Sequence, residues 1–438
     1  MKSLYRILAM LCVFPGSCVA QQAVRLSLSQ AIAMATSPNG NASVQLANAA
    51  AQVAGAHLAY AHSLLLPLIE ASVGESNLTR NLAAEGFNFP TGVPNFTIPA
   101  QVGPFNNFDA RVTMTQNVFD LSALHRARGL RANLDAAKAN VNLHRELSAA
   151  QVAHDYLVAL RADSSMEAAQ AAINESEALL KTAQDRADTG KAPELEVTRA
   201  KLTLLADQRK LSAAQNDSVQ AKLHLLEDLG LSYATELQLA DHLTFATDDV
   251  PDVEAAVATA FQSRPELQEN RERKVEAHAN DIANRDGWLP VVTGYGDVGP
   301  LDGVVTHTVG VSARITVFDG GRRGAERAET TAMVRESEIR ERDLRRKIEL
   351  EVRSAHAALK AAAAQAVESQ MALKLSGDEL AEAQRRFEAG VIGNSEVVEA
   401  QTRSAQAQDD LIGVLFNWNQ ARVDLAEATG TASTLSMR

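Results

Sequence analysis

ITVFDGGRRGAE, residues 315–326, has the pattern of a strand that ends abruptly and becomes a helix. The stretch NVFDLSALHRAR at 117–128 has the same pattern. Their Val-Phe-Asp triplets begin at Val118 and Val317, which are 199 positions apart (317 − 118), and further matches follow at nearly the same offset. A long self-similarity of this kind indicates that the chain holds two copies of one structural plan.

The matches extend over most of the chain. RADTGKAPELEV (186–197) pairs with RFEAGVIGNSEVV (386–398), and LLEDLGLS (225–232) pairs with LAEATGTA (425–432). Each copy reads as a short helix, a Pro-marked junction, two strands, a very long helix, a small-residue turn and a long helix. The expected organisation is a signal segment, a first repeat, a linker, a second repeat and a tail, at 1–20, 21–232, 233–252, 253–430 and 431–438.

The N-terminal segment has the features of an export signal. Lys2 and Arg6 form a positive region, Ile7 to Phe14 is a short apolar core, and CVA precedes Gln21 as a cleavage site. Both cysteines lie in this segment, so the mature chain would hold no disulfide. The run PGSC is a poor version of a lipoprotein box, and lipidation of Cys18 remains an alternative to cleavage before Gln21.

Composition and charge exclude several classes of function. Only 4% of the 438 residues are aromatic, which suits long helices packed through small side chains better than a thick globular core. The formal charge is −12, and it becomes −14 (−12 − 2) without Lys2 and Arg6. An acidic exported chain is a poor nucleic-acid binder, because binding a polyanion needs clustered cations.

The helical pattern is typical of a coiled coil. Leu130, Leu134, Ala137 and Val141 step by four, three and four, and the pattern continues without proline from about 122 to about 188. At 1.5 Å per residue such a helix would be roughly 100 Å long. On the helices alone, a generic coiled-coil rod is the simplest interpretation.

The strands favour a different class of protein. Residues 69–79, 108–118, 291–299 and 306–318 alternate apolar and polar side chains, the weak signature of membrane β-barrel strands. The first pair is joined by a long loop over 83–107 and the second by PLDG. Four strands cannot close a barrel, and open strand edges are not tolerated in lipid. The sequence therefore predicts an oligomer, with eight strands from two chains or twelve from three.

With these features the chain resembles the TolC family of bacterial outer-membrane efflux and secretion channels. The resemblance rests on the strand-entry prolines Pro67 in SLLLP and Pro290 in GWLP, on VFDGGRRGA and on RRFEAGVIGNSEVVEAQ. It implies a mainly α fold with membrane β-structure: a homotrimer with a twelve-stranded barrel in outer-membrane lipid and a periplasmic tunnel of long helices. The implied partners are a periplasmic adaptor (membrane fusion protein) and, through it, an inner-membrane pump.

The strand-to-helix junctions have structural roles. Asp120 and Asp319 are expected to cap the helices that follow, with Ser122 as a second candidate in the first repeat. Gly320 and Gly321 would allow the sharp change of backbone direction.

The small-residue turns carry the candidate functional residues. The resemblance assigns Glu396 and Glu399 to a ring of carboxylates at the periplasmic constriction, and Glu196 to a position that helps to hold the closed state. The alternative for these acids is simple stabilisation of a helix N-terminus. Gly190, Gly390 and Val391 match the adaptor-docking turns, although glycine also ends helices in general. Lys191 and Ile392 depart from the family pattern, so the details of gate latching do not carry over.

The remaining motifs carry no chemistry. GYGDVG (294–299) matches a dinucleotide fingerprint, but Pro300 and a strand follow it instead of a helix. The ten histidines are scattered, and neither a metal-ligand cluster nor a catalytic constellation is apparent. We therefore expect no cofactor and no enzymatic activity, and a passive exit duct in the outer membrane. The alternative is a periplasmic structural coiled coil or adaptor without a barrel.

Overall fold

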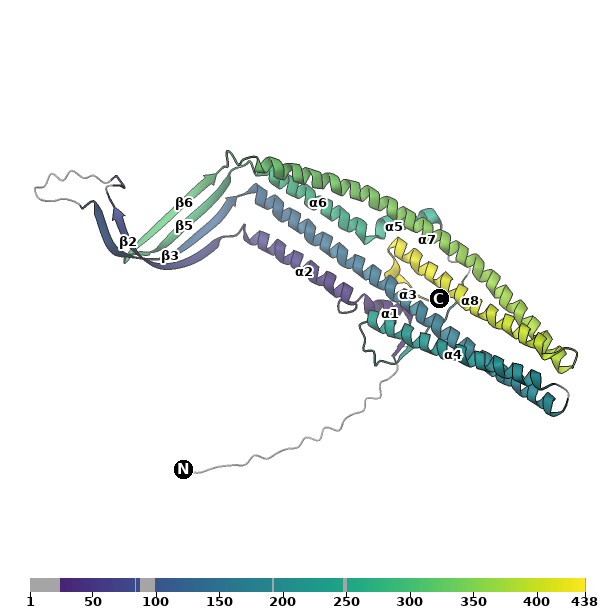
Figure 1. Ribbon diagram of the computed structural model, residues 1–438. Coiled ribbons are helices and arrows are strands. Elements are labelled where there is room, and N and C mark those ends of the chain that lie inside the picture. The colour runs from purple at the N-terminus through teal and green to yellow at the C-terminus, as the bar shows by residue number, and fades with distance from the viewer. Residues whose placement is uncertain (1–23, 83, 87–98, 191–192, 247–249, 438) are drawn as a thin grey trace, which may run out of the picture. The chain divides into compact units, whose positions relative to one another are not determined.

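The computed structural model describes residues 24–82, 84–86, 99–190, 193–246 and 250–437 (Figure 1). The signal segment, with Cys18, and Lys191 lie outside these ranges. The described residues form two compact units: one comprises those within 24–44, 145–257 and 351–437, and the other those within 45–144 and 258–350. As expected, the fold is mainly helical with four main strands, and α3 (Leu121–Asp188) and α7 (Arg322–Glu388) each run through both units.

The second unit contains one antiparallel sheet, ordered β2-β3-β5-β6. Its strands are β2 (Leu68–Asn81), β3 (Gln101–Phe119), β5 (Val291–Leu301) and β6 (Val304–Arg314). Pro67 and Pro290 each stand directly before a strand, where the missing N–H costs no ladder bond. A two-residue Asp302-Gly303 turn joins β5 to β6, with φ of 48° and 82°, which suits the twist of a tight hairpin.

Two expected boundaries were wrong. The loop was expected to reach residue 107, but Gln101 already pairs with Asn81, so 101–107 belong to β3. The last strand was expected to reach residue 318, but it ends at Arg314, which pairs with Val291. The partner strand is preceded by Pro290, which has no N–H to offer, so residues 315–318 have no ladder to join.

The two faces of the sheet differ sharply. The register places on one face mainly apolar side chains that are exposed to solvent in the single chain: Ile69, Val73, Val112, Met114, Val298, Val305, Val309 and Val311. The opposite face carries Arg111, which pairs with Asp109 at 2.7 Å and with Asp297 at 3.2 Å. On that face the ring of Tyr295 lies where a side chain at position 310 would be, and the residue there is Gly310.

The strands differ in length. β3 has 19 residues and β5 has 11, and their pairing begins at Asp109 with Leu301. At that level the N–H of Phe108 donates to Asp302 Oδ1 at 2.7 Å, and the N–H of Asp302 donates to the Phe108 carbonyl at 2.8 Å. Residues 101–108 therefore have only β2 beside them among the described strands.

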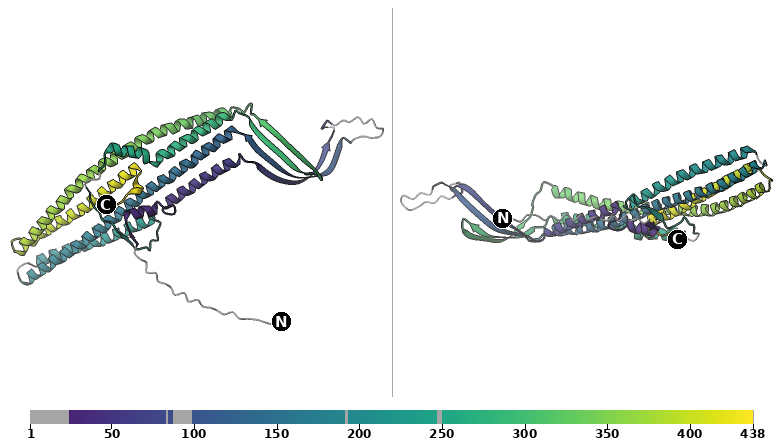
Figure 2. Two further views of the ribbon diagram at one scale, coloured as in Figure 1. Left: turned by 180° about the vertical axis from the view of Figure 1, so that it is seen from behind. Right: turned by 90° about the horizontal axis from the view of Figure 1, so that it is seen from below.

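The helices of this unit pack through small and polar residues. α6 (Pro265–Asp286) lies between α3 and α7 in Figure 1 and in the left view of Figure 2. Polar pairs join it to α3 (Asn133 with Glu276, Asn140 with Glu269) and to α7 (Lys274 with Glu341, Thr330 with Asp281). A Cβ atom at Gly129 would lie 2.9 Å from Asn280 Oδ1 and 3.6 Å from Ala279 Cβ, so α3 and α6 approach each other closely at this glycine. α2 (Ala42–Ser63) packs on α3, and α5 (Val253–Ser263) precedes α6.

The strand-to-helix junctions differ between the repeats. Asp120 accepts a 2.9 Å hydrogen bond from the N–H of Ala123, which is the geometry of an N-cap. Ser122 does not cap: it is the second residue of α3, and its buried hydroxyl has no hydrogen-bond partner. Asp319 stands three residues before α7, accepts from the N–H of Gly321 and Arg323, and also pairs with the Arg323 guanidinium at 3.2 Å. Gly320 and Gly321 have φ of 68° and 90°.

The first unit contains the larger apolar core. α1 (Leu28–Ala35), α4 (Glu194–Asp228) and α8 (Asn394–Thr429) contribute to it together with the later part of α3. A two-stranded parallel sheet of β1 (Val24–Leu26) and β4 (Leu237–Leu239) and the short η1 (Ala432–Thr434) complete the unit. Asp241 ties these elements together, since its carboxylate accepts from the N–H of Leu28 at 2.7 Å and from the Tyr156 hydroxyl at 2.8 Å.

No helix within the described ranges is both long and apolar enough to cross a membrane.

Asp228, at the end of α4 in the first unit, has a raised pKa. Burial raises the pKa of Asp228 to about 7, together with the hydrogen bond that its protonated carboxyl donates to Asp155 and the negative charge of Asp155. Asp228 Oδ2 is buried without a hydrogen-bond partner, and Gln151 Nε2 donates to Asp155 Oδ2 at 3.0 Å. Two acceptor groups in contact require a proton between them, so the folded chain binds a proton that the unfolded chain releases above about pH 4.

This pair predicts a pH dependence of stability. Because the folded-state pKa is raised, the stabilisation is present below the unfolded pKa and is lost as the pH rises from about 4 through about 7. We expect the unfolding midpoint of detergent-solubilised protein to fall between pH 5 and pH 8, measured by thermal circular dichroism. Asp228→Asn should flatten this slope and raise the midpoint at pH 8, whereas Asp217→Asn, on the same helix, should change neither. An unchanged slope in Asp228→Asn would show that the pair does not hold the proton.

Candidate functional site

Each repeat ends its long helix in a glycine turn, and these two turns form the candidate site. We call residues 186–197 the first tip and residues 386–398 the second tip. Gly190 and Gly390 have φ of 70° and 75°. At the second tip the N–H of Gly390 donates to the Phe387 carbonyl at 3.0 Å and that of Val391 to the Arg386 carbonyl at 2.9 Å. This left-handed helix end favours glycine, and it leaves the Val391 side chain 73% exposed.

The two tips are in contact with each other. The Arg186 guanidinium lies 4.2 Å from the ring centre of Phe387, and its Nη1 donates to the Phe387 carbonyl at 3.2 Å. From the other side, Asn394 Nδ2 donates to the Glu196 carbonyl at 3.4 Å. An apolar cluster closes the contact, formed by Leu179, Phe387 and Val397 with Ala383, Ile392 and Val398. The turns that the sequence places about 200 positions apart therefore act as one structural element.

Glu196 lies in this contact and not at the open surface. It is the third residue of α4, a position from which a glutamate usually reaches back to the N–H of the capping residue. The capping residue here is Pro193, which has no N–H, and Glu196 Oε2 is buried without a hydrogen-bond partner. Asn394 is 1% exposed, and its Oδ1 is also unpartnered. Buried acceptors without donors destabilise a contact, so this junction is weaker than its packing suggests.

Glu396 and Glu399 have the opposite character. Both are exposed in the single chain, and their i, i+3 spacing in α8 places them on one helix face. Arg403, one turn further on, lies 3.9 Å from Glu399 through its Nη1. The structure thus presents two carboxylates to solvent, with a single cation beside the second one.

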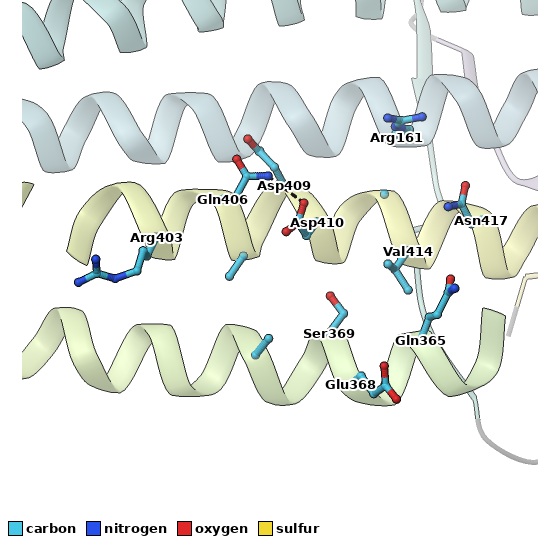
Figure 3. A pocket seen from close by; sticks show the side chains of 13 residues that line it. Arg161, Gln365, Glu368, Ser369, Arg403, Gln406, Asp409, Asp410, Val414 and Asn417 are labelled. Carbon is cyan, nitrogen blue, oxygen red and sulfur yellow. Dashed lines mark hydrogen bonds between the residues drawn. The ribbon is translucent and has the colours of Figure 1, made fainter. Parts of the chain in front are cut away.

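A groove of about 840 Å³, which Arg403 helps to line, lies between α3, α7 and α8 (Figure 3). Its lining is largely polar and charged, with Arg161 from α3, Glu368 from α7, and Arg403 and Asp409 from α8. Gln406 donates to Asp410 at 2.9 Å within it. Such an open and charged groove suits a polar partner surface better than a buried apolar ligand. Within the described ranges, no group of three or more His, Cys, Asp or Glu side chains is placed to hold a metal ion.

The sequence did not single out the residues that join the tips. Arg186 and Phe387 occupy polar helix ends, where no periodicity marks them, and they are 201 positions apart. Phe387 could have been noticed because a large aromatic residue is rare in the long helices. Asn394 could not, because an asparagine at a helix start normally indicates a cap and not a buried contact.

Comparisons with known proteins identify relatives of this architecture. The family model described as "Outer membrane efflux protein" matches residues 36–231 and 256–431. The fold is similar to the CmeC outer membrane channel of Campylobacter jejuni, with a TM-score of 0.77 at 16% identity over 92% of this chain and 86% of that one. It is also similar to CusC, with a TM-score of 0.76 at 16% identity over 98% and 99% of the two chains.

A third similar structure is the open state of the MtrE outer membrane channel of Neisseria gonorrhoeae. Its TM-score is 0.75 at 16% identity, over 93% of this chain and 89% of that one. None of the curated proteins matches the chain significantly in sequence.

The contact between the tips predicts an energetic coupling between Arg186 and Phe387. Arg186→Met keeps most of the side-chain volume and removes the charge, so it should cost about 0.5–1 kcal/mol of local opening free energy at the tips. Phe387→Leu should cost a similar amount, and the double variant should cost less than the sum of the two. Hydrogen exchange of the amides in 180–200 measures this opening, with Lys181→Met as the control. Strictly additive costs would contradict the contact.

Proposed function

This chain belongs to the outer membrane efflux protein family, and we propose that three copies of it assemble into one channel. As a member of that family it is an outer-membrane exit duct and not an enzyme. In the proposed assembly, the sheets of three chains close a twelve-stranded barrel in the outer membrane, and their long helices continue as a tunnel in the periplasm.

The two-faced sheet is the observation that carries this proposal. A sheet with an exposed apolar face and a polar, ion-paired face has the composition of a barrel wall, with lipid on one side and water on the other. The strand length agrees, since β5 and β6 have 11 residues each and a tilted transmembrane strand needs about 9–11. A soluble periplasmic coiled coil would give this apolar face nothing to cover it.

The edges of the sheet support an oligomer. β2 and β6 each have one strand neighbour among the described strands. In hydrocarbon an unpaired backbone group costs several kcal/mol, so β6 of one copy would pair with β2 of the next. Two copies would give eight strands and three would give twelve, and barrels of both sizes are known. The resemblance to the TolC family favours three.

The partners follow from the tips. Gly190, Gly390 and Val391 form exposed turns that would dock the helical hairpin of a periplasmic adaptor, which links the duct to an inner-membrane pump. Glycine has no side chain to prevent close backbone approach at these turns. The pump supplies the energy, and the duct itself is passive.

The gate is formed by carboxylates at the tips. Threefold symmetry would gather Glu396 and Glu399 into a ring of six acids, which would favour cations at the constriction. The unpartnered buried oxygens of Glu196 and Asn394 make the contact between the tips weak enough to rearrange when the duct opens.

Native mass spectrometry of protein extracted from the outer-membrane fraction tests the assembly. We expect three chains, each beginning at Gln21. Three chains that begin at a lipidated Cys18 would keep the channel and change the view of its anchor. A single chain recovered from the soluble periplasm would overturn the barrel, and the coiled-coil alternative would replace it.

The charge of the gate is tested in planar bilayers. The double variant Glu396→Gln with Glu399→Gln should lower the ratio of cation to anion permeability several-fold, because it removes six negative charges from the constriction. The ratio is measured from the reversal potential in a KCl gradient. Glu329→Gln with Glu338→Gln, in the first half of α7, is the charge-matched control. An unchanged ratio in the gate variant would show that these residues do not line the constriction.

A further inference from the structure

Arg403 has a position that neither the family nor the proposed function assigns. It projects from α8 between two carboxylates on different helices. Its Nη2 and Nε donate to the two oxygens of Glu379 on α7 at 2.7 Å and 3.1 Å. Its Nη1 lies 3.9 Å from Glu399, one helical turn before it on α8. One guanidinium therefore faces an acid of the neighbouring helix and an acid of the proposed gate.

The two contacts are unequal. The contact with Glu379 is a two-pronged pair, in which planar guanidinium and planar carboxylate match, and this is the strongest geometry for such a pair. The contact with Glu399 is at the limit of an ion pair and makes no hydrogen bond. Glu379 thus holds the directional bonds of Arg403, while Glu399 experiences the cation only through its charge.

Two other acids near this group are already engaged. Glu382, one turn after Glu379 on α7, pairs with Arg385 and Arg386 at 2.8 Å and 2.9 Å. On α8, Asp410 accepts from Gln406. The basic residues of α8 are Arg403 and Arg422, and Arg403 is the one nearer to the proposed gate acids on this helix.

We propose that Arg403 sets the effective charge of the gate. Its pairing with Glu379 limits how far its positive charge offsets the negative charge of Glu399. This inference rests on the proposed function of Glu396 and Glu399. While Glu379 holds Arg403, Glu399 retains most of its negative charge and the constriction favours cations. When Glu379 no longer binds Arg403, the Arg403 side chain can turn toward Glu399, one helical turn before it on α8, and form a full ion pair with it.

The proposal predicts opposite effects from the two partners. Arg403→Gln should raise the cation-to-anion permeability ratio, and Glu379→Gln should lower it, each by about twofold, the size that corresponds to a surface ion pair. A plain sum of charges predicts the same signs, so the single variants do not decide between the two explanations.

The double variant decides. If Glu379 acts through Arg403, Glu379→Gln should have little effect once Arg403→Gln is present, and the double variant should behave like Arg403→Gln alone. If the charges simply add, Glu379→Gln should lower the ratio equally in both backgrounds, and the double variant should resemble the parent channel. This second result would overturn the proposal.

The design is completed by one control variant and by the double gate variant described above. Arg385→Gln, which removes an arginine from the Glu382 pair, is the matched control and should leave the coupling between Glu379 and Arg403 unchanged. All ratios are measured with the purified full-length channel in planar bilayers under a KCl gradient. If the double gate variant of Glu396 and Glu399 leaves the ratio unchanged, the assignment of these residues to the gate is wrong. The proposed role of Arg403 is then wrong as well. If that variant lowers the ratio but the Glu379 effect is additive, only the role of Arg403 is wrong.

Discussion

Unpaired backbone groups along the outer strands of the sheet are the constraint on which the architecture depends. A single chain offers apolar side chains on one face of its sheet, but β2 and β6 each have a free edge among the strands that the structure describes. In lipid each unpaired backbone group on those edges costs several kcal/mol of free energy, which opposes the free energy gained by burying the apolar face. Burial of the face and pairing of the edges must therefore occur together. The sheet also constrains α3, because this helix begins at Leu121, two residues after β3 ends at Phe119. Pairing in the barrel would therefore also fix the spacing of the helices that leave it.

Local chemistry made much of this fold predictable from the sequence. The 3-and-4 stripe predicted a helix from about 122 to 188, and α3 runs from Leu121 to Asp188. The prolines before the strands and the glycines at the tips act within a few residues of their own position. Tertiary pairing was not predictable in this way. Residues 101–107 have the composition of a loop and become strand through pairing with β2. Residues 315–318 have the composition of a strand but pair with none of the described strands.

The candidate site shows the same division. The position of each tip follows from glycine spacing, but the contact between the tips does not. Arg186 and Phe387 are 201 positions apart, and Arg403 and Glu379 are 24 apart on different helices. No period in the sequence relates such pairs, because they depend on how whole helices pack. The repeats thus share a backbone plan while their side chains have diverged: Glu196 is partly buried in the contact between the tips, and Glu396 and Glu399 remain exposed.

The unequal strand lengths have a consequence for depth. Beyond Asp109 the outer part of β3 has only β2 beside it among the described strands, and Asp302 satisfies the backbone of Phe108 at that level. A one-sided ribbon can hydrogen-bond to water but not to hydrocarbon. In the proposed channel, the outer boundary of the bilayer can then stand no higher than Leu301, and the β2–β3 ribbons must rise above it in water. In the proposed channel, the pattern of backbone pairing therefore sets an upper limit for the outer membrane–water interface, independently of which side chains are apolar.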